Sequence, residues 1–294
     1  MQFRTDLALE AAESLTDPAK LTASDVEKSM VSEGAATITR IRILSQRGAE
    51  VMGKPAGQYI TVEIPPLSDS GSELEETALL IGRELRYLLP ENGAVMVVGL
   101  GNKSITPDAL GPQMADMTLA TRHIQGEFCR AYGLDGLRPA MVMAPGVMGQ
   151  TGMESSEVIR GLCREMQPAA VIAVDALAAR STARLGCTVQ LCDTGISPGS
   201  GVGNNRQALN MDTLGIPVIG FGIPTVVDAR TLAMEITQGK ADEETVAPRG
   251  AQMMVTPREI DLIISRASRL AAMSIHAALH PDFSPAELLS VAGD

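Results

Sequence analysis

Residues 94–112 read AVMVVGLGNKSITPDALGP, and the order of apolar, glycine and acidic residues in this stretch indicates the fold. The valine-rich run 94–100 is bounded by glycines, which is typical of a fully buried strand in a parallel sheet. Pro107 has the φ angle of a first helical turn, so a helix is predicted directly after the loop. Asp108 is therefore placed after the carboxyl end of a buried strand, where ligands bind in open α/β sheets.

Other strands follow from the periodicity of apolar residues. Alternating side chains predict two half-exposed edge strands, at 36–44 and 59–64. Short apolar runs predict further strands, at 140–144, 169–174, 188–191 and 217–223. In this prediction Asp175 terminates the second of these runs, and Pro224 terminates the last.

Helices are predicted between these strands. Apolar stripes and capping residues indicate helices near 72–88, 109–133 and 155–166. Two closing helices are predicted to start at the caps Thr256 and Ser284, each followed by proline. Strands that alternate with helices build parallel βαβ units, so we predict an α/β fold. The chain shows no low-complexity linker and no internal repeat, which favours one domain.

Charge and composition exclude several classes of protein. The formal net charge of −11 disfavours direct binding of nucleic acid, which requires clustered Lys and Arg. The sequence contains no run of 18 apolar residues, so no membrane span is predicted, and the first residues contain no apolar signal-peptide core. The four cysteines form no CxxC pair, so we expect reduced thiols in a cytoplasmic protein.

Two aspartates are candidates for catalysis. Asp108 and Asp175 each follow an apolar strand, so both would lie at one edge of the sheet if the strands are parallel neighbours. Paired carboxylates can divide general base and general acid roles when burial and repulsion separate their pKa values. The alternative is that each aspartate only caps a following helix, and the pattern alone leaves both readings open.

Two glycine-rich loops are candidates for substrate binding, because backbone N–H groups can hold an extended peptide or an oxyanion. Tight turns that need positive φ explain the same composition equally well. The second loop has neither Rossmann nor P-loop spacing. The candidates are Gly146, Gly149, Gly199, Gly201 and Gly203, with Asn204 and Arg206 for polar substrate groups.

A metal centre is not predicted. His276 and His280 have the i, i+4 spacing of metal ligands on a helix, but no third ligand is placed to match and the HExxH motif is absent. We therefore expect these histidines to have a structural or surface role, and we expect no cofactor.

Five ordered motifs carry a resemblance to a known family. They read GLGN…TPDALGP, APGVMGQTGME, VDALAAR, DTGISPGSGVGNNR and LGIPVIGFGIPTVVDA, and together they closely resemble the germination proteases of spore-forming bacteria. The resemblance runs from about Arg4 to the final helices. It implies a three-layer phosphorylase/hydrolase-like sandwich with a largely parallel central sheet, shared with hydrogenase maturation proteases.

The resemblance also implies an activity. Members are atypical aspartic-type endopeptidases that degrade small acid-soluble spore proteins in the spore core during germination, and the two essential carboxylates fall on Asp108 and Asp175. They are made as zymogens and assemble as tetramers. The segment FRTDLALEA matches the processing region, which implies cleavage between Asp6 and Leu7. Residues 1–6 are then expected to be a residual pro-segment, and 7–294 the protease domain.

Two alternatives remain open from the sequence. One is a hydrogenase-maturation-type endopeptidase whose carboxylates grip a metal carried by its substrate. The other is a non-catalytic protein that uses the same loops to hold a peptide. Lys103 stands where many members have an aromatic residue, and close approach of its ammonium group would favour the ionised form of Asp108.

Overall fold

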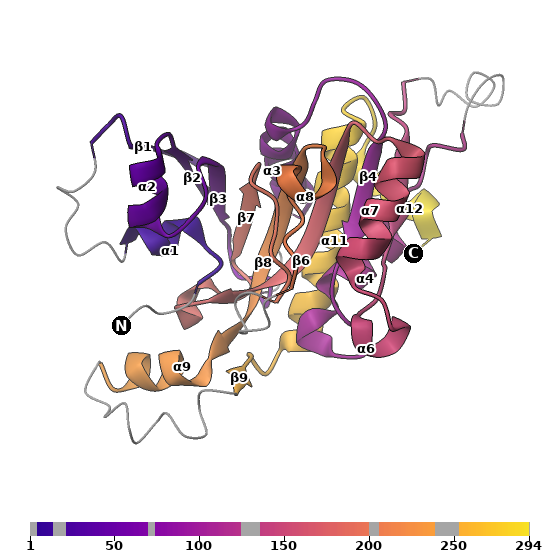
Figure 1. Ribbon diagram of the computed structural model, residues 1–294. Coiled ribbons are helices and arrows are strands. Elements are labelled where there is room, and N and C mark those ends of the chain that lie inside the picture. The colour runs from indigo at the N-terminus through magenta and orange to yellow at the C-terminus, as the bar shows by residue number, and fades with distance from the viewer. Residues whose placement is uncertain are drawn as a thin grey trace.

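One mixed sheet forms the centre of the protein in the computed structural model, which describes residues 5–13, 22–69, 74–124, 136–199, 206–238 and 253–293 (Figure 1). The strand order is β1-β2-β3-β7-β8-β6-β4-β5, and β9 pairs with β8. Strands β8, β6, β4 and β5 are parallel, and the other pairs are antiparallel. The bounds are Val26–Glu33 (β1), Ala36–Ile43 (β2), Gly57–Glu63 (β3), Val95–Gly99 (β4), Ala140–Met143 (β5), Ala170–Ala179 (β6), Thr188–Cys192 (β7), Val218–Asp228 (β8) and Met254–Val255 (β9).

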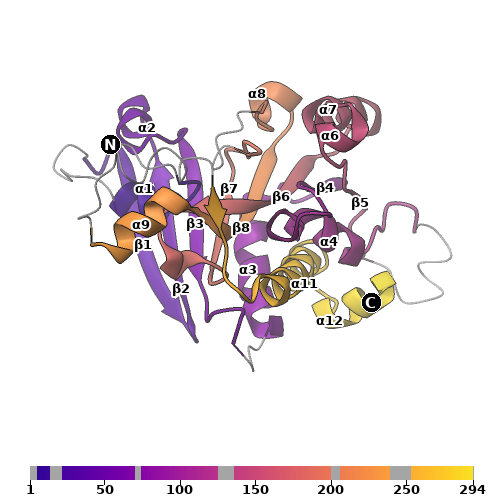
Figure 2. The ribbon, with the colours of Figure 1, turned by 90° about the horizontal axis from the view of Figure 1, so that it is seen from below.

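Helices cover both faces of this sheet, which confirms the predicted α/β class and its three layers. Helices α3, α4 and α11 lie on one face, and α7 and α8 lie on the other (Figure 2). Among the described residues, no helix has the length and apolarity needed to cross a membrane. The helices are Ala8–Glu13 (α1), Gln46–Met52 (α2), Leu74–Leu88 (α3), Leu110–Met117 (α4), Met148–Thr151 (α6), Ser155–Met166 (α7), Met211–Leu214 (α8), Ala229–Ile236 (α9), Ile260–Leu279 (α11) and Pro285–Gly293 (α12), with 3-10 turns at Thr106–Asp108 (η2) and Thr182–Arg184 (η3).

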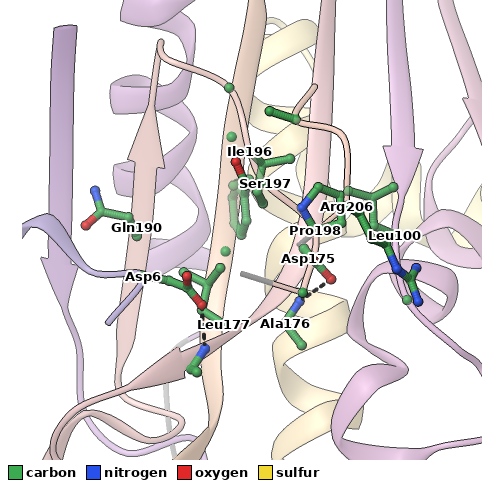
Figure 3. Close-up of a pocket in the computed structure, with 18 of the residues that line it drawn as sticks. Asp6, Leu100, Asp175, Ala176, Leu177, Gln190, Ile196, Ser197, Pro198 and Arg206 are labelled. Carbon is green, nitrogen blue, oxygen red and sulfur yellow. Dashed lines mark hydrogen bonds between the residues drawn. The ribbon is translucent and has the colours of Figure 1, made fainter. Parts of the chain in front are cut away.

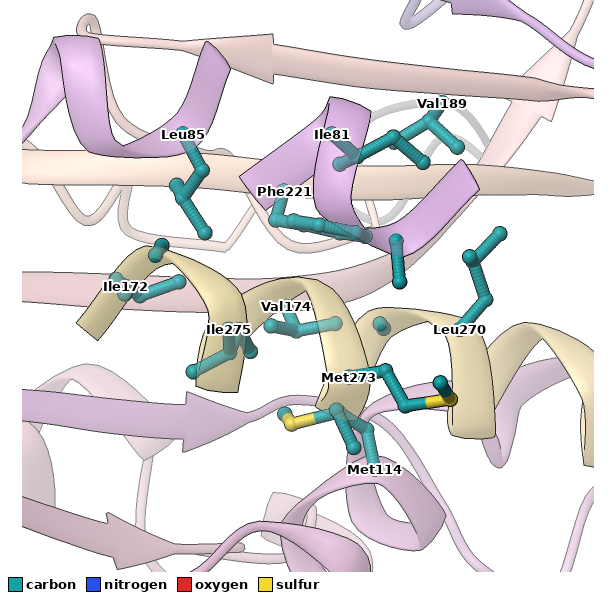
Figure 4. Close-up of a cluster of buried hydrophobic side chains, with 14 of the residues drawn as sticks. Ile81, Leu85, Met114, Ile172, Val174, Val189, Phe221, Leu270, Met273 and Ile275 are labelled. Carbon is teal, nitrogen blue, oxygen red and sulfur yellow. The ribbon is translucent and has the colours of Figure 1, made fainter. Parts of the chain in front are cut away.

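The run of valines in β4 is explained by burial on both sides. Val95 and Val97 join the large core under α3 and α11, whereas Met96 and Val98 join the core under α7. In the large core, Ile81 and Leu85 of α3 approach Phe221 of β8 (Figure 4). Each such side chain, when fully buried, stabilises the fold by about 1.5–3 kcal/mol. A strand with apolar side chains on both faces is stable only between two layers of helices.

Two smaller apolar clusters attach the N-terminal region to the sheet. Ala8 and Ala11 of α1 pack with Ile41, Met52 and Tyr59. Leu7 is fully buried in a second cluster, which it shares with Leu177, Ala179 and Val227. The first described residues are therefore held against β6 and β8.

The prediction that 36–44 and 59–64 are edge strands is wrong. They form β2 and β3, which lie inside the sheet because β2 pairs with β1 and β3 pairs with β7. The edge is instead β1, whose sequence VEKSMVSE is mostly polar and exposed. A polar strand with little apolar alternation gives no periodic signal, and its pairing with β2 is visible only in the structure.

The predicted ends of two parallel strands are also wrong. Strand β6 continues through Asp175 to Ala179, and β8 continues through Pro224 to Asp228. The register between them shifts at Leu177 and Ala178, opposite Pro224. Such an irregularity accommodates a proline, which has no N–H to give to a ladder.

Two helix predictions need correction. The helix predicted over 109–133 ends at Met117, and the amides of Thr121 and Arg122 instead bond to the carbonyl oxygen of Ala140. Residues 125–133 of the predicted range lie outside the described residues. Helix α11 begins at Ile260 and not at the Thr256 cap, because the Thr256 hydroxyl donates to the carbonyl of Thr225. The Ser284 cap is confirmed, since its hydroxyl accepts the amide of Glu287.

Candidate active site

Asp108 is held by the turn that follows β4. The carboxylate Oδ2 of Asp108 accepts the backbone N–H of Asn102 at 2.8 Å, and the backbone N–H of Asp108 donates to the carbonyl of Ile105 at 2.8 Å. The hydroxyl of Thr225, on β8, donates to the carbonyl of Pro107 at 2.8 Å and ties the turn to the sheet. Asp108 therefore sits on a short, fully bonded turn, which restricts the positions its carboxylate can take.

Asp175 lies on the neighbouring strand, at the point where β4 stops. The last β4–β6 pair joins Gly99 to Val174, and the amide of Leu100 then donates to the carbonyl of Val174 at 2.8 Å. Asp175 is the next residue of β6, and only 6% of its surface is exposed. The prediction that both acids meet at one edge of the parallel strands is thus confirmed by the pairing of β4 with β6.

Both carboxylates line one cavity of about 450 Å³ (Figure 3). Its walls include the apolar side chain of Leu100, directly after β4, apolar side chains from β6 and β8, and the segment 194–199. Gly199 and Arg206, two predicted substrate-binding residues, line it as well. Such a concave, mostly apolar site with a few convergent polar groups is the usual form of a ligand site.

The environments of the two carboxyls differ. Burial raises the pKa of Asp108, but the N–H of Asn102 and the charge of Arg206 oppose this shift. Burial raises the pKa of Asp175 well above its ordinary value, and the negative charge of Asp108 raises it further. Asp175 therefore keeps its proton more firmly than Asp108 does, as a general acid paired with a general base must.

Helix capping does not account for either aspartate. The residue at the N-cap of α4 is Ala109, which makes no side-chain cap, and the Asp108 carboxylate points back to Asn102. No helix follows Asp175 directly, because β6 continues to Ala179. The capping alternative is therefore wrong at both positions.

The N-terminal segment enters the same cavity. The N–H of Asp6 donates to the carbonyl of Ala178 at 3.2 Å, and the N–H of Ala178 donates to the Asp6 carboxylate at 2.9 Å. Lys54 contributes its Nζ, which donates to the carbonyls of Thr5 and Asp6 at 3.0 and 3.1 Å. Asp6 thus lines the cavity, whereas Leu7 is buried beside it.

The other predicted site residues are distributed differently. Gly146 and Gly149 are not among the residues that line the cavity, although Gln150 of the same loop donates to the Asn102 side chain at 2.9 Å. Gly201, Gly203 and Asn204 lie outside the described residues. Lys103 forms an exposed ion pair with Asp116, so Arg206 and not Lys103 is the cation that acts on Asp108.

Lys54, Tyr59 and Gln190 are among the cavity residues that were not predicted from the sequence. Lys54 follows a glycine-capped turn at the end of α2, and Tyr59 and Gln190 lie on β3 and β7. Each reads locally as an ordinary loop or strand residue. A polar residue in a buried strand, such as Gln190, was the one signal that could have been used.

His276 and His280 are buried structural residues. The Nε2 of His276 accepts the amide of Leu119 at 2.9 Å, and the Nδ1 of His280 accepts the amide of Arg138 at 3.2 Å. Leu119 precedes residues 125–135 in the chain and Arg138 follows them, so the two histidines hold both flanking segments against α11. Among the residues that the structure describes, no group of three His, Cys, Asp or Glu side chains comes together as metal ligands would.

Comparison with known proteins gives consistent matches. The model of the germination protease family matches residues 5–239. The germination protease of Caldanaerobacter subterraneus is 38% identical over 317 residues, which cover 97% of each chain. That of Clostridium perfringens is 38% identical over 312 residues (95% of each), and that of Priestia megaterium is 34% identical over 346 residues (94% of this chain and 93% of that protein).

A solved structure shows a more distant likeness. The [NiFe] hydrogenase maturation protease of Thermococcus kodakarensis is 18% identical, with a TM-score of 0.37 over 65% of this chain and 98% of that chain. This likeness is too distant to carry an inference about the site.

Proposed function

The chain belongs to the germination protease family and is therefore a peptidase, and we propose that Asp108 and Asp175 are its catalytic pair. In this proposal the enzyme cleaves small acid-soluble spore proteins in the spore core during germination. The observation that carries the assignment is the shared cavity, in which a carboxyl on the turn after β4 and a carboxyl on the adjacent strand β6 have unequal environments.

The unequal environments suggest a division of roles. Asp108, which Arg206 and the Asn102 amide favour as an anion, takes a proton from water as the water adds to the peptide carbonyl. Asp175, buried and held protonated, gives its proton to the leaving nitrogen as the C–N bond breaks. The products are a carboxylic acid and an amine, and each carboxyl ends in the opposite protonation state.

Substrate binding is proposed for the cavity walls. Gly199 offers backbone groups there, and Arg206 supplies a cation close to both carboxylates. A role for Gly146, Gly149, Gly201, Gly203 and Asn204 stays a prediction.

Self-processing between Asp6 and Leu7 is part of the same proposal. Asp6 already lies in the cavity and pairs with Ala178, next to the strand segment that carries Asp175. Cleavage would separate residues 1–6 from the domain 7–294. Assembly as a homotetramer also stays a prediction, and light scattering of the purified chain would test it.

Replacement of either aspartate tests the mechanism. Asp108→Asn and Asp175→Asn are each expected to lower kcat/KM for a small acid-soluble spore protein by at least about 100-fold, the usual contribution of a general acid or base. Asp261→Asn, an exposed aspartate on α11, is the matched control and should keep wild-type activity. Circular dichroism would establish that the variants are folded. Wild-type activity in either site variant would disprove the two-carboxylate mechanism.

A further inference from the structure

Lys54 contacts the N-terminal segment, which forms part of the cavity wall. Gly53 ends α2 in a left-handed conformation, with a φ of 62°, and turns the chain so that Lys54 lines the cavity. Its Nζ then donates to two successive backbone carbonyls, those of Thr5 and Asp6. A lysine that donates to main-chain oxygens contacts groups that every peptide has, whatever its sequence.

The bound segment lies as an added strand would. Both backbone groups of Ala178 bond to Asp6, one to its amide and one to its carboxylate. This part of β6 lies beyond Val174, where its pairing with β4 ends. Such an unpaired strand edge is a common docking site for an extended peptide. Residues 5–7 therefore show how a peptide binds this edge of β6, beside the cavity.

The carbonyl that Lys54 contacts belongs to the bond proposed for processing. Asp6 contributes this carbonyl to the Asp6–Leu7 peptide group, and Leu7 places its side chain in the apolar cluster with Leu177 and Val227. Water that adds to the carbonyl carbon leaves a negative charge on this oxygen. A donor already fixed at the oxygen stabilises that charge without reorganisation.

We propose that Lys54 is a further catalytic residue, which binds the oxygen of the carbonyl under attack both at Asp6–Leu7 and in separate substrates. The inference rests on the proposed two-carboxylate peptidase. Water adds to the carbonyl carbon, its proton passes to Asp108, and the oxyanion is held by the Lys54 ammonium. The carbonyl then reforms, the C–N bond breaks, and Asp175 protonates the nitrogen.

The surroundings of Lys54 are compatible with a charged donor. Burial lowers the pKa of Lys54, and the negative charges of Asp6 and Glu10 oppose this shift. An ammonium that has lost much of its hydration interacts more strongly with a developing oxyanion than one in water does. The other reading is that Lys54 only anchors the N-terminal segment.

Two reactions of the full-length protein distinguish these roles. Self-cleavage between Asp6 and Leu7 is followed by intact mass, and kcat and KM are measured on a separate small acid-soluble spore protein. The variants are Lys54→Met, Lys54→Gln and Lys54→Arg, with Lys28→Met on exposed β1 as the matched control. Any variant that does not process itself is first cleaved by tagged wild-type enzyme, which is then removed by its tag.

Lys54→Met is expected to lower kcat about 100-fold on the separate substrate, the usual effect of losing one oxyanion donor, with little change in KM. Lys54→Arg should recover part of this loss, and Lys28→Met should behave as wild type. If Lys54→Met does not fold, Lys54→Gln decides, with the same expected direction. An unchanged kcat in the folded variant, or an effect on self-cleavage alone, would overturn the proposal. Loss of the proposed function would look different, since the wild type would then be inactive or Asp175→Asn fully active.

Discussion

Replacement of Gly101 by alanine should disable Asp108 without touching a carboxyl group. Gly101 has a φ of 113°, and a Cβ atom built there would lie 2.1 Å from the carbonyl oxygen of Asp108 and 3.2 Å from its Oδ1. Since real Cβ atoms essentially never approach closer than 3.0 Å, one of the two backbones must move by at least 3.0 − 2.1 = 0.9 Å. The clash is with backbone, so no side-chain rotation can relieve it.

The size of the effect follows from this displacement. A misplacement of about 1 Å in a catalytic constellation can cost about 100-fold in rate, which corresponds to about 2.7 kcal/mol of transition-state stabilisation. The unfavourable φ adds a loss of about 1–3 kcal/mol in the free energy of unfolding. We therefore expect Gly101→Ala to be folded but destabilised, with kcat/KM reduced about 100-fold.

Gly136→Ala provides the matched control. Gly136 has a similar φ of 102°, but an added Cβ would meet no atom of the described residues within 4 Å. Both variants should lose the free energy of unfolding that the positive φ costs, and Gly101→Ala should lose more in urea titrations because of its backbone clash. Only Gly101→Ala should lose activity on a small acid-soluble spore protein below its melting temperature. Wild-type kcat/KM in Gly101→Ala, or an equal loss in Gly136→Ala, would refute the argument that the turn positions Asp108.

Three further predictions concern Arg206, the two buried histidines and the core under α3. Arg206→Met removes the charge that opposes the raised pKa of Asp108, so the acidic limb of the kcat/KM profile should move to higher pH, and an unmoved limb would contradict the role of Asp108 as base. Burial lowers the pKa of His276 and His280 to about 4, so between pH 6.5 and pH 4 only the unfolded chain binds protons at these histidines, and the free energy of unfolding should fall as the pH falls through this range. In the double variant His276→Gln with His280→Gln, the urea midpoint of unfolding should change less between pH 7 and pH 5 than in the wild type. An equal pH dependence in both proteins would count against this explanation. Leu85→Ala, at a fully buried position of α3, should lose about 2–5 kcal/mol of unfolding free energy, whereas Leu79→Ala, half exposed on the same helix, should change it by less than about 0.5 kcal/mol in urea titrations.

Much of the parallel half of the sheet could be predicted from local sequence. The strands at 95–99, 140–143 and 170–174 and the helices at 74–88 and 155–166 are continuous apolar runs or clear amphipathic stripes, and the structure has them nearly as predicted. Long-range pairing explains the errors. The polar strand β1 is ordered by β2, and β6 and β8 extend past Asp175 and Pro224 because they pair with each other beyond the end of β4.

The sequence by itself determined which chemistry-bearing residues follow buried apolar runs. The spacing of GLGN and TPDALG around Asp108, and the apolar run that precedes Asp175, set these positions through local backbone preference and burial. Only the tertiary structure decided what surrounds them. Arg206, Lys54 and the carbonyl of Asp6 come together from distant parts of the chain, because β4 ends at Gly99 and leaves the edge of β6 free. Contacts between residues 48 or more positions apart have no local signature, since they depend on strand order and not on neighbouring residues.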